Sequence, residues 1–184
     1  MKKKSSIGLL LIFLLPFLIA ANLMFFAVVN TNQDLQLLLN NSFEALEMSS
    51  TTRVIFSIAL GSVGQLLIIF VAFIIFKVAL KICKASNGWE EEILITQLVA
   101  ATLTYVFGLF SLDFFPHAFN LIIVLSSILE LVIFLSFSIY NIKDKKALKI
   151  IIVTKLLLFI FNLFFAINPI GKLLTQLSQL ENRC

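Results

Sequence analysis

One acidic residue, Glu130, lies in the middle of an apolar run, SSILELVIFLSF, from Ser126 to Phe137. A carboxylate at the centre of a bilayer costs on the order of 3 kcal/mol on insertion scales, so we expect it to face the interior of a helix bundle or a water-filled cavity. Lys155 is the natural partner of Glu130. The number of residues between Glu130 and the basic connection at residues 141–146 nearly equals the number between that connection and Lys155. Antiparallel neighbouring helices would bring both side chains to similar depths. We therefore predict an intramembrane ion pair between Glu130 and Lys155.

Three further polar residues share helix faces with this pair. Asn120, Ser127 and Glu130 recur at i, i+7 and i+10, which places them on one side of a helix. Lys155 and Asn162 share one side of the next helix by the same reasoning. The spacing predicts a polar seam between the two helices. Its residues leave two interpretations open: a structural pair that fixes helix register, or a proton or ligand site.

The helices that carry these residues must cross a membrane. Of the 184 residues, 60% are hydrophobic and only 13% are charged, and the mean hydropathy is +1.07, well outside the range of soluble domains. About 20 consecutive apolar residues span a hydrocarbon core. Such runs occupy residues 7–29, 54–80, 93–112, 118–140 and 148–167. They predict an all-α, polytopic membrane protein that forms a single membrane domain over residues 1–184.

An amphipathic segment at residues 33–48 separates the first two runs. Its apolar residues recur at intervals of three and four against acidic and amide side chains: Leu35, Leu38, Leu39, Phe43 and Leu46. This pattern predicts a short helix that lies on the outer face of the membrane. A helix that binds a partner protein is the alternative.

Basic residues gather at alternate ends of the predicted helices. Lysines cluster at residues 2–4, 77–84 and 143–149, whereas the opposite ends carry only Arg53, Lys172 and Arg183. By the positive-inside rule, this predicts a membrane protein with a cytoplasmic N-terminus and an outer C-terminus. The lipid bilayer is its first partner, and attraction to anionic headgroups accounts for the net charge of +4 without any nucleic acid.

Two of the predicted helices carry small residues at helix-packing spacing. The second has Ser57, Gly61 and Gly64 beside Gln65, and the third has Ala100, Thr104 and Gly108 near Gln97. Small residues let helix backbones approach closely in a membrane. We expect close helix contact here, with the two glutamines bonded across it or to a partner subunit.

The stretch KASNGWEEE forms the connection between the same two helices. Asn87 and Gly88 are a turn signal, and Asn87 with Glu90 has the spacing of a capping box. Trp89 fits an interfacial anchor. The acidic residues suit the first turn of a helix, and a regulatory acidic site is the alternative.

The sequence argues against an enzyme. His117, the only histidine, falls at the outer end of a helix, away from any intramembrane serine. Glu91 and Glu92 lie at a membrane edge without the arginine of glutamate-type CAAX proteases, and the chain has no P-loop. Cys83 and Cys184 fall on opposite sides of the membrane, and no Cys or His pair has metal-ligand spacing. We predict no catalytic residue, no metal site and no cofactor.

The order of these parts resembles the bacterial branch of the Yip family, the Ypt-interacting multi-pass membrane proteins. The resemblance covers roughly Glu44 to Tyr140, where a long helix ends in a basic, Gly-containing turn that is followed by an aromatic residue, here Trp89. It implies an isolated first helix, an outer amphipathic segment and a four-helix core, with no catalytic residues. Bacterial relatives resemble accessory subunits, some of which work beside ABC-type exporters that protect against toxic peptides.

Three functions are compatible with the sequence. The first is a non-enzymatic accessory or partner-binding subunit, for example of a peptide exporter or resistance system, bound to another membrane protein or to copies of itself. The second is a small transporter or channel whose polar path uses Glu130, Lys155 and Asn162. The third is a stand-alone immunity protein against a membrane-active peptide.

Overall fold

The structure is a computed structural model that describes residues 6–85, 88–115 and 119–167. Its helices are α1 (Ser6–Thr31), α2 (Gln33–Ala45), α3 (Ser50–Ile82), α4 (Glu90–Phe114), α5 (Phe119–Asn141) and α6 (Lys145–Ile167). The described residues contain no strand. All the helices except α2 are long and apolar enough to cross a membrane. The chain is therefore an all-α, multi-pass membrane protein, which confirms the prediction from the apolar runs.

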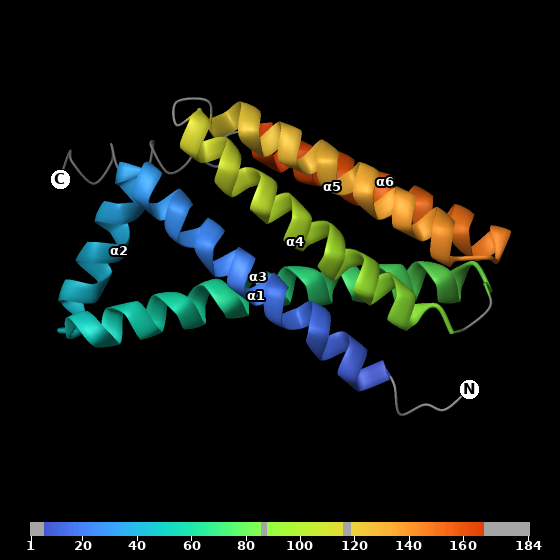
Figure 1. Cartoon of the computed structure of the whole chain (residues 1–184), viewed down its shortest axis with the longest axis horizontal. Coiled ribbons are helices and arrows are strands. Elements are labelled where there is room, and N and C mark those ends of the chain that lie inside the picture. Colours follow the sequence, from blue (N-terminus) through green and yellow to red (C-terminus); the bar gives the residue numbers. More distant parts are fainter. Residues whose placement is uncertain (1–5, 86–87, 116–118, 168–184) are drawn as a thin grey trace.

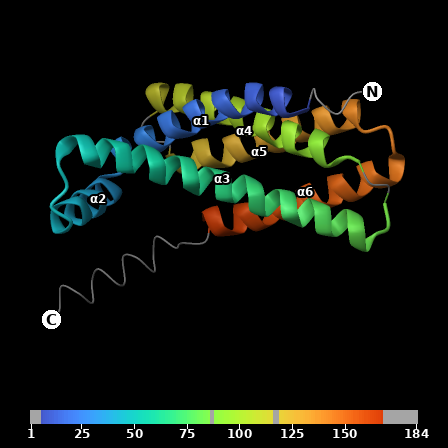
Figure 2. The ribbon, with the colours of Figure 1, turned by 90° about the horizontal axis from the view of Figure 1, so that it is seen from below.

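Helix α4 is the centre of the bundle. It packs most extensively against α5 and α1, while α6 packs against both α5 and α3. Figure 1 shows α4 and α5 side by side, with α1 crossing α3. Figure 2 shows α3 and α6 running next to each other. Burial follows this arrangement. In the most apolar stretch of α4, 44% of the residues are buried, compared with 6% in that of α3.

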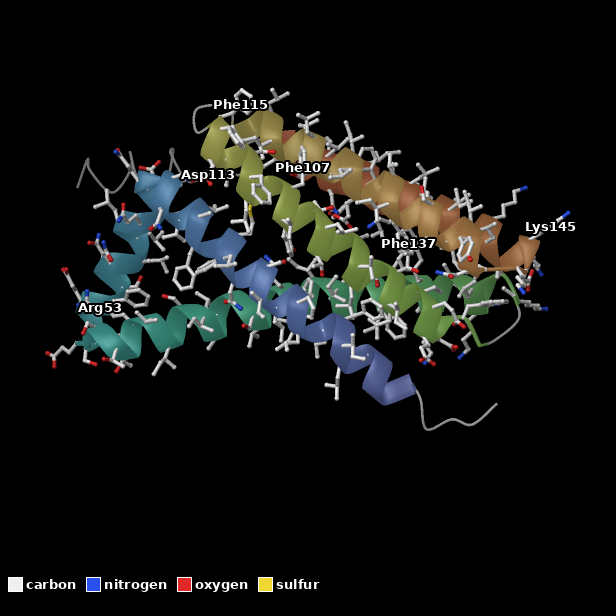
Figure 3. All side chains as sticks on the ribbon, in the orientation of Figure 1. Arg53, Phe107, Asp113, Phe115, Phe137 and Lys145 are labelled. Carbon is white, nitrogen blue, oxygen red and sulfur yellow. The ribbon has the colours of Figure 1, made fainter. Side chains whose placement is uncertain are left out.

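The two ends of the bundle differ in charge. The α3–α4 and α5–α6 connections meet at one end, where Lys146 Nζ donates a hydrogen bond of 3.0 Å to the backbone oxygen of Lys84. Figure 3 shows Lys145 at this end and Arg53 and Phe115 at the other. Helix α2 runs across the second end and joins α1 to α3 (Figure 1). The predicted gathering of lysines at one end thus holds for the described helices.

Side-chain caps fix where α2 and α3 begin. Asn32 Oδ1 accepts from the backbone N–H of Leu35 (3.2 Å), and Ser49 Oγ accepts from that of Thr52 (3.3 Å). An N-cap of this kind satisfies a backbone donor that has no partner inside the helix. Because Ser49 is the cap, α3 begins several residues before the apolar run that predicted it.

Both helices end in a Schellman motif. At the end of α2, Met48 N–H donates to Phe43 O and Glu47 N–H to Glu44 O, and α3 repeats this geometry with Lys84 in place of Glu47. Glu47 and Lys84 both have φ of 49°, the left-handed conformation that usually requires glycine. The amphipathic helix, predicted over residues 33–48, therefore ends at Ala45.

The side chains of the bundle form two buried clusters. The larger lies toward the lysine-rich end, and its stacked rings of Phe76 and Phe134 have centroids 5.4 Å apart. Trp89 packs against this cluster and is the N-cap residue of α4. The smaller cluster joins α1 to α4 through Phe17 and Leu98. Helices α3 and α4 both contribute side chains to the two clusters and so connect them.

The capping box predicted for α4 includes Asn87, which lies outside the described residues. Its other member, Glu90, accepts through Oε2 from the backbone N–H of Gly88 at 3.2 Å, and Trp89 is the N-cap residue of α4. Trp89 has no side-chain cap hydrogen bond. Other predictions fall on residues outside the described part of the chain: those for Lys2, Lys3, Lys4, His117, Lys172, Arg183 and Cys184.

Candidate functional site

Glu130 and Lys155 meet in the middle of the bundle. Lys155 Nζ lies 2.5 Å from Glu130 Oε1, which is the one ion pair between described residues. At 1.5 Å per residue, Glu130 lies about 15 Å from either end of α5, and Lys155 is similarly central in α6. The structure thus brings together the two residues whose spacing predicted an intramembrane pair.

An aromatic side chain holds Lys155 from a second direction. Its Nζ lies 4.8 Å from the centroid of the Phe134 ring, close enough for a cation–π interaction. Phe134 in turn stacks on Phe76 of α3. Because Phe134 lies one helical turn beyond Glu130 toward the lysine-rich end, the stacked rings cover that side of the ion pair. The Lys155 side chain is accordingly only 9% exposed.

A second polar contact lies next to the pair. The Tyr105 hydroxyl of α4 donates a hydrogen bond to Gln65 Oε1 of α3. The Glu130 carboxylate is near enough to interact electrostatically with this hydroxyl. Gln65, Tyr105, Glu130 and Lys155 form what we call the central polar cluster, to which α3, α4, α5 and α6 each contribute one side chain.

Sequence reasoning missed Tyr105. It expected Gln65 and Gln97 to bond across the helix contact or to a partner subunit, whereas Gln65 bonds to Tyr105 and the buried Gln97 Oε1 has no hydrogen-bond partner among the described residues. A signal for Tyr105 was present. Tyrosines of membrane helices gather at the interfaces, and this one lies well inside an apolar run.

Glu130 lies on the side of α5 that faces the bundle. Ile128 and Val132 are exposed on the membrane side of α5, and each is two residues from Glu130, which corresponds to about 200° around a helix of 3.6 residues per turn. The Glu130 side chain is nevertheless 31% exposed. Water at this exposed part would solvate the second carboxylate oxygen.

Ser127 and Asn162, two of the remaining residues of the predicted polar seam, do not join this cluster. Ser127 Oγ donates to the backbone oxygen of Ile123 within its own helix (2.9 Å). Asn162 is exposed, as are its neighbours Ile160 and Phe161, because this end of α6 is covered less than its middle. Asn120 lies in the first turn of α5, outside the residues whose side chains are described. A shared helix face was thus insufficient to predict a continuous seam.

The small-residue faces pack mainly against α1. A Cβ atom added at Gly61 would lie 2.9 Å from Asn22 Oδ1, and one at Gly108 would lie 3.1 Å from Met24 Cε. Asn22 Nδ2 also donates to Ser62 Oγ at 2.8 Å. The expected isolation of the first helix is therefore wrong, because α1 packs closely against α3 and α4.

Other members of these faces have different surroundings. Ser57, Ala100 and Thr104 are buried, but Thr104 Oγ1 has no hydrogen-bond partner among the described residues. A Cβ atom at Gly64 would meet nothing within 4 Å. Gly64 is thus the one predicted packing glycine that faces open space.

The described residues contain no group of three His, Cys, Asp or Glu side chains suited to holding a metal ion.

No protein-family model matches the chain, and neither a curated protein nor a solved structure is significantly similar to it. The geometry thus defines a multi-pass helical membrane protein with a mid-membrane polar cluster, and its function has to be argued from that geometry.

Proposed function

We propose that this chain is a non-enzymatic membrane subunit that binds a transmembrane helix of a partner protein. The observation that carries this proposal is the surface of α3. This helix has 33 residues, more than the roughly 20 needed to cross a membrane. Only 6% of its most apolar stretch is buried in the chain's own bundle. It contributes one residue, Gln65, to the central polar cluster and leaves most of its apolar surface to the bilayer.

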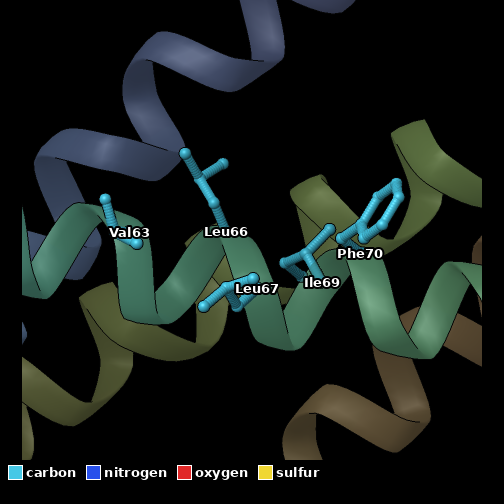
Figure 4. A pocket seen from close by; sticks show the side chains of 5 residues that line it. All are labelled: Val63, Leu66, Leu67, Ile69 and Phe70. Carbon is cyan, nitrogen blue, oxygen red and sulfur yellow. The ribbon is translucent and has the colours of Figure 1, made fainter.

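A shallow depression marks where a partner helix would fit. It has a volume of about 350 Å³ and is lined by Val63, Leu66, Leu67, Ile69 and Phe70 (Figure 4). Gly64 lies within the same stretch of α3 and has open space before it. Because helices associate in lipid through close packing at small residues, a glycine beside an apolar depression favours a protein helix over a lipid chain.

The partner that we favour is a subunit of an ABC-type exporter or another toxin-resistance system in a bacterial cytoplasmic membrane. The resemblance to bacterial Yip relatives supports this choice, as does the lack of a P-loop in the sequence. The lysine-rich end would face the cytoplasm, in accordance with the positive-inside rule. The chain itself would then bind and position other subunits.

Site-specific photo-cross-linking in native membranes tests this function. We expect benzoylphenylalanine at position 67 to form an adduct with a second membrane protein, because Leu67 lines the depression. The same group at position 132 of α5 is the matched control, since Val132 and Leu67 are almost equally exposed. Adding Gly64→Phe should abolish the adduct from position 67. Equal yields from both positions, or lipid adducts alone, would refute the proposal.

A small transporter is the second candidate, and the position of Glu130 on the side of α5 that faces the bundle favours it. Five buried oxygens without described partners lie on the facing helices α4 and α5: Glu92 Oε2, Gln97 Oε1, Thr104 Oγ1, Ser126 Oγ and Ser138 Oγ. Water bound to these atoms would extend the polar region on either side of Glu130. Proton flux into vesicles that is abolished by Glu130→Gln, in a variant of unchanged stability, would favour this function over the first.

A further inference from the structure

Two groups of lysines meet at one end of the bundle. Lys81 and Lys84 lie at the end of α3, and Lys145, Lys146 and Lys149 lie in the first turns of α6. The two helices pack against each other, which places the groups side by side. All five side chains are exposed. We call these five residues the lysine platform.

A hydrogen bond fixes the two halves of the platform to each other. Lys146 Nζ donates to the backbone oxygen of Lys84 at 3.0 Å. That oxygen belongs to the left-handed residue of the Schellman motif that ends α3. The end of one helix is therefore tied to the start of the other, which holds the ammonium groups over a defined area.

The platform keeps a positive charge despite nearby acidic residues. The lysine-rich end of the described helices carries seven lysines and four acidic residues: Lys77, Lys81, Lys84, Lys143, Lys145, Lys146 and Lys149, and Glu90, Glu91, Glu92 and Asp144. Asp144 Oδ1 accepts from the backbone N–H groups of Lys146 (2.8 Å) and Ala147 (3.3 Å) and so caps α6. Seven lysines against four acidic residues leave a formal net charge of +3 at this end.

Apolar side chains continue the surface toward the membrane interior. Val78 is exposed about one turn before Lys81 on α3, and Val153 is exposed one turn beyond Lys149 on α6. A surface that is cationic at its edge and apolar below matches a phospholipid, whose headgroup and acyl chains have the same order. A soluble anion would use only the cationic part.

We propose that the lysine platform is a binding site for the phosphodiester headgroup of an anionic phospholipid, with the acyl chains along Val78 and Val153. The ammonium groups of Lys81 and Lys149 bind the phosphate oxygens from two helices. A bound lipid therefore bridges α3 and α6 at the same end as the hydrogen bond between Lys146 and Lys84. This inference is independent of the proposed partner subunit.

The single tryptophan provides the probe for a test. Trp89 packs against the cluster that contains Leu80 of α3 and Ala147 of α6, so it lies close to the platform. The full chain is reconstituted in phosphatidylcholine vesicles that contain a small fraction of brominated lipid, which quenches nearby tryptophan fluorescence. We expect brominated phosphatidylglycerol to quench Trp89 more strongly than brominated phosphatidylcholine at the same mole fraction.

Single lysine substitutions separate a built site from a diffuse positive surface. Lys81→Gln and Lys149→Gln should each lower the preference for phosphatidylglycerol about five-fold, since one lysine near an anionic surface contributes about 1 kcal/mol. Lys143→Gln removes the same charge from the α5–α6 connection and should keep the preference, as should Lys149→Arg. Equal losses in all the glutamine variants, or no preference in the wild type, would overturn the proposal. Loss of the preference in excess glycerol phosphate would show that a free phosphate, not a lipid, is the ligand.

Discussion

Lys155 Nζ and Glu130 Oε1 lie 2.5 Å apart at the middle of two antiparallel membrane-spanning helices. The Phe134 ring covers the lysine from one side, and Glu130 faces the bundle interior. Because a buried ion pair is sensitive to the loss of either partner, this relationship has direct consequences for stability.

Removal of one charge should destabilise the bundle much more than removal of both. Glu130→Met and Lys155→Met each leave an uncompensated charge, which commonly costs about 3 to 5 kcal/mol. The double substitution replaces the pair by apolar side chains and should recover most of the loss. The melting temperature of the purified protein in detergent measures all three variants. Single variants as stable as the wild type would show that the pair contributes nothing to folding.

The two glycines of α3 should respond differently to the same substitution. Gly61→Ala places a Cβ atom 2.9 Å from Asn22 Oδ1 and 3.3 Å from the Phe25 ring, so these two side chains of α1 must move. We expect a loss of about 1 to 3 kcal/mol, typical of overpacking. Gly64→Ala has open space and should be neutral or slightly stabilising. Thermal unfolding of the two variants compares them directly, and equal melting temperatures would contradict the packing of α1 on α3.

The left-handed residues that end α2 and α3 are sites where glycine should stabilise the protein. Glu47 and Lys84 have φ of 49°, a conformation that costs a non-glycine residue roughly 1 kcal/mol. Glu47→Gly should therefore raise the melting temperature, whereas Glu44→Gly, inside α2, should lower it by the helix-propensity penalty. Lys84→Gly should behave like Glu47→Gly, because Lys146 bonds to the backbone of residue 84. A lower melting temperature for Glu47→Gly would contradict the assigned helix end.

The orientation of the chain can be tested with its exposed cysteine. Cys83 lies at the lysine-rich end, which the positive-inside rule assigns to the cytoplasm. In intact cells, a membrane-impermeant maleimide should label Cys83 only after permeabilisation, with Cys184 changed to serine. Arg53→Cys in a background without Cys83 and Cys184 is the control and should react without permeabilisation. The reverse pattern would invert the topology.

Features that depend on long apolar runs or on paired charges could be predicted from the sequence. The five spans are dictated by hydrocarbon thickness, and the pairing of Glu130 with Lys155 follows from one short connection between antiparallel helices. The apolar residues of α2, which recur at intervals of three and four, likewise predicted that this segment is a helix. These predictions need no knowledge of how helices that are distant in the sequence pack against each other.

Features that depend on helix neighbours could not be predicted. The face of Gly61 was recognised as a packing surface, but nothing local shows that Asn22 of α1 occupies it. The bond between Tyr105 and Gln65 likewise requires the relative rotation of α3 and α4. The ends of α2 and α3 were missed for another reason. Glu47 and Lys84 occupy the left-handed position that follows each helix, and a glycine there would have indicated the helix end in the sequence.

We propose that the ion pair between Glu130 and Lys155 stabilises the helix bundle, whereas the exposed surface of α3 binds the partner protein. The most direct measurement is the yield of the partner adduct from benzoylphenylalanine at position 67 in the double variant Glu130→Met, Lys155→Met. This variant keeps the lining of the α3 depression and replaces the buried pair by apolar side chains. We predict the wild-type yield. A stable double variant that forms no adduct would contradict the claim and place the function in the central polar cluster.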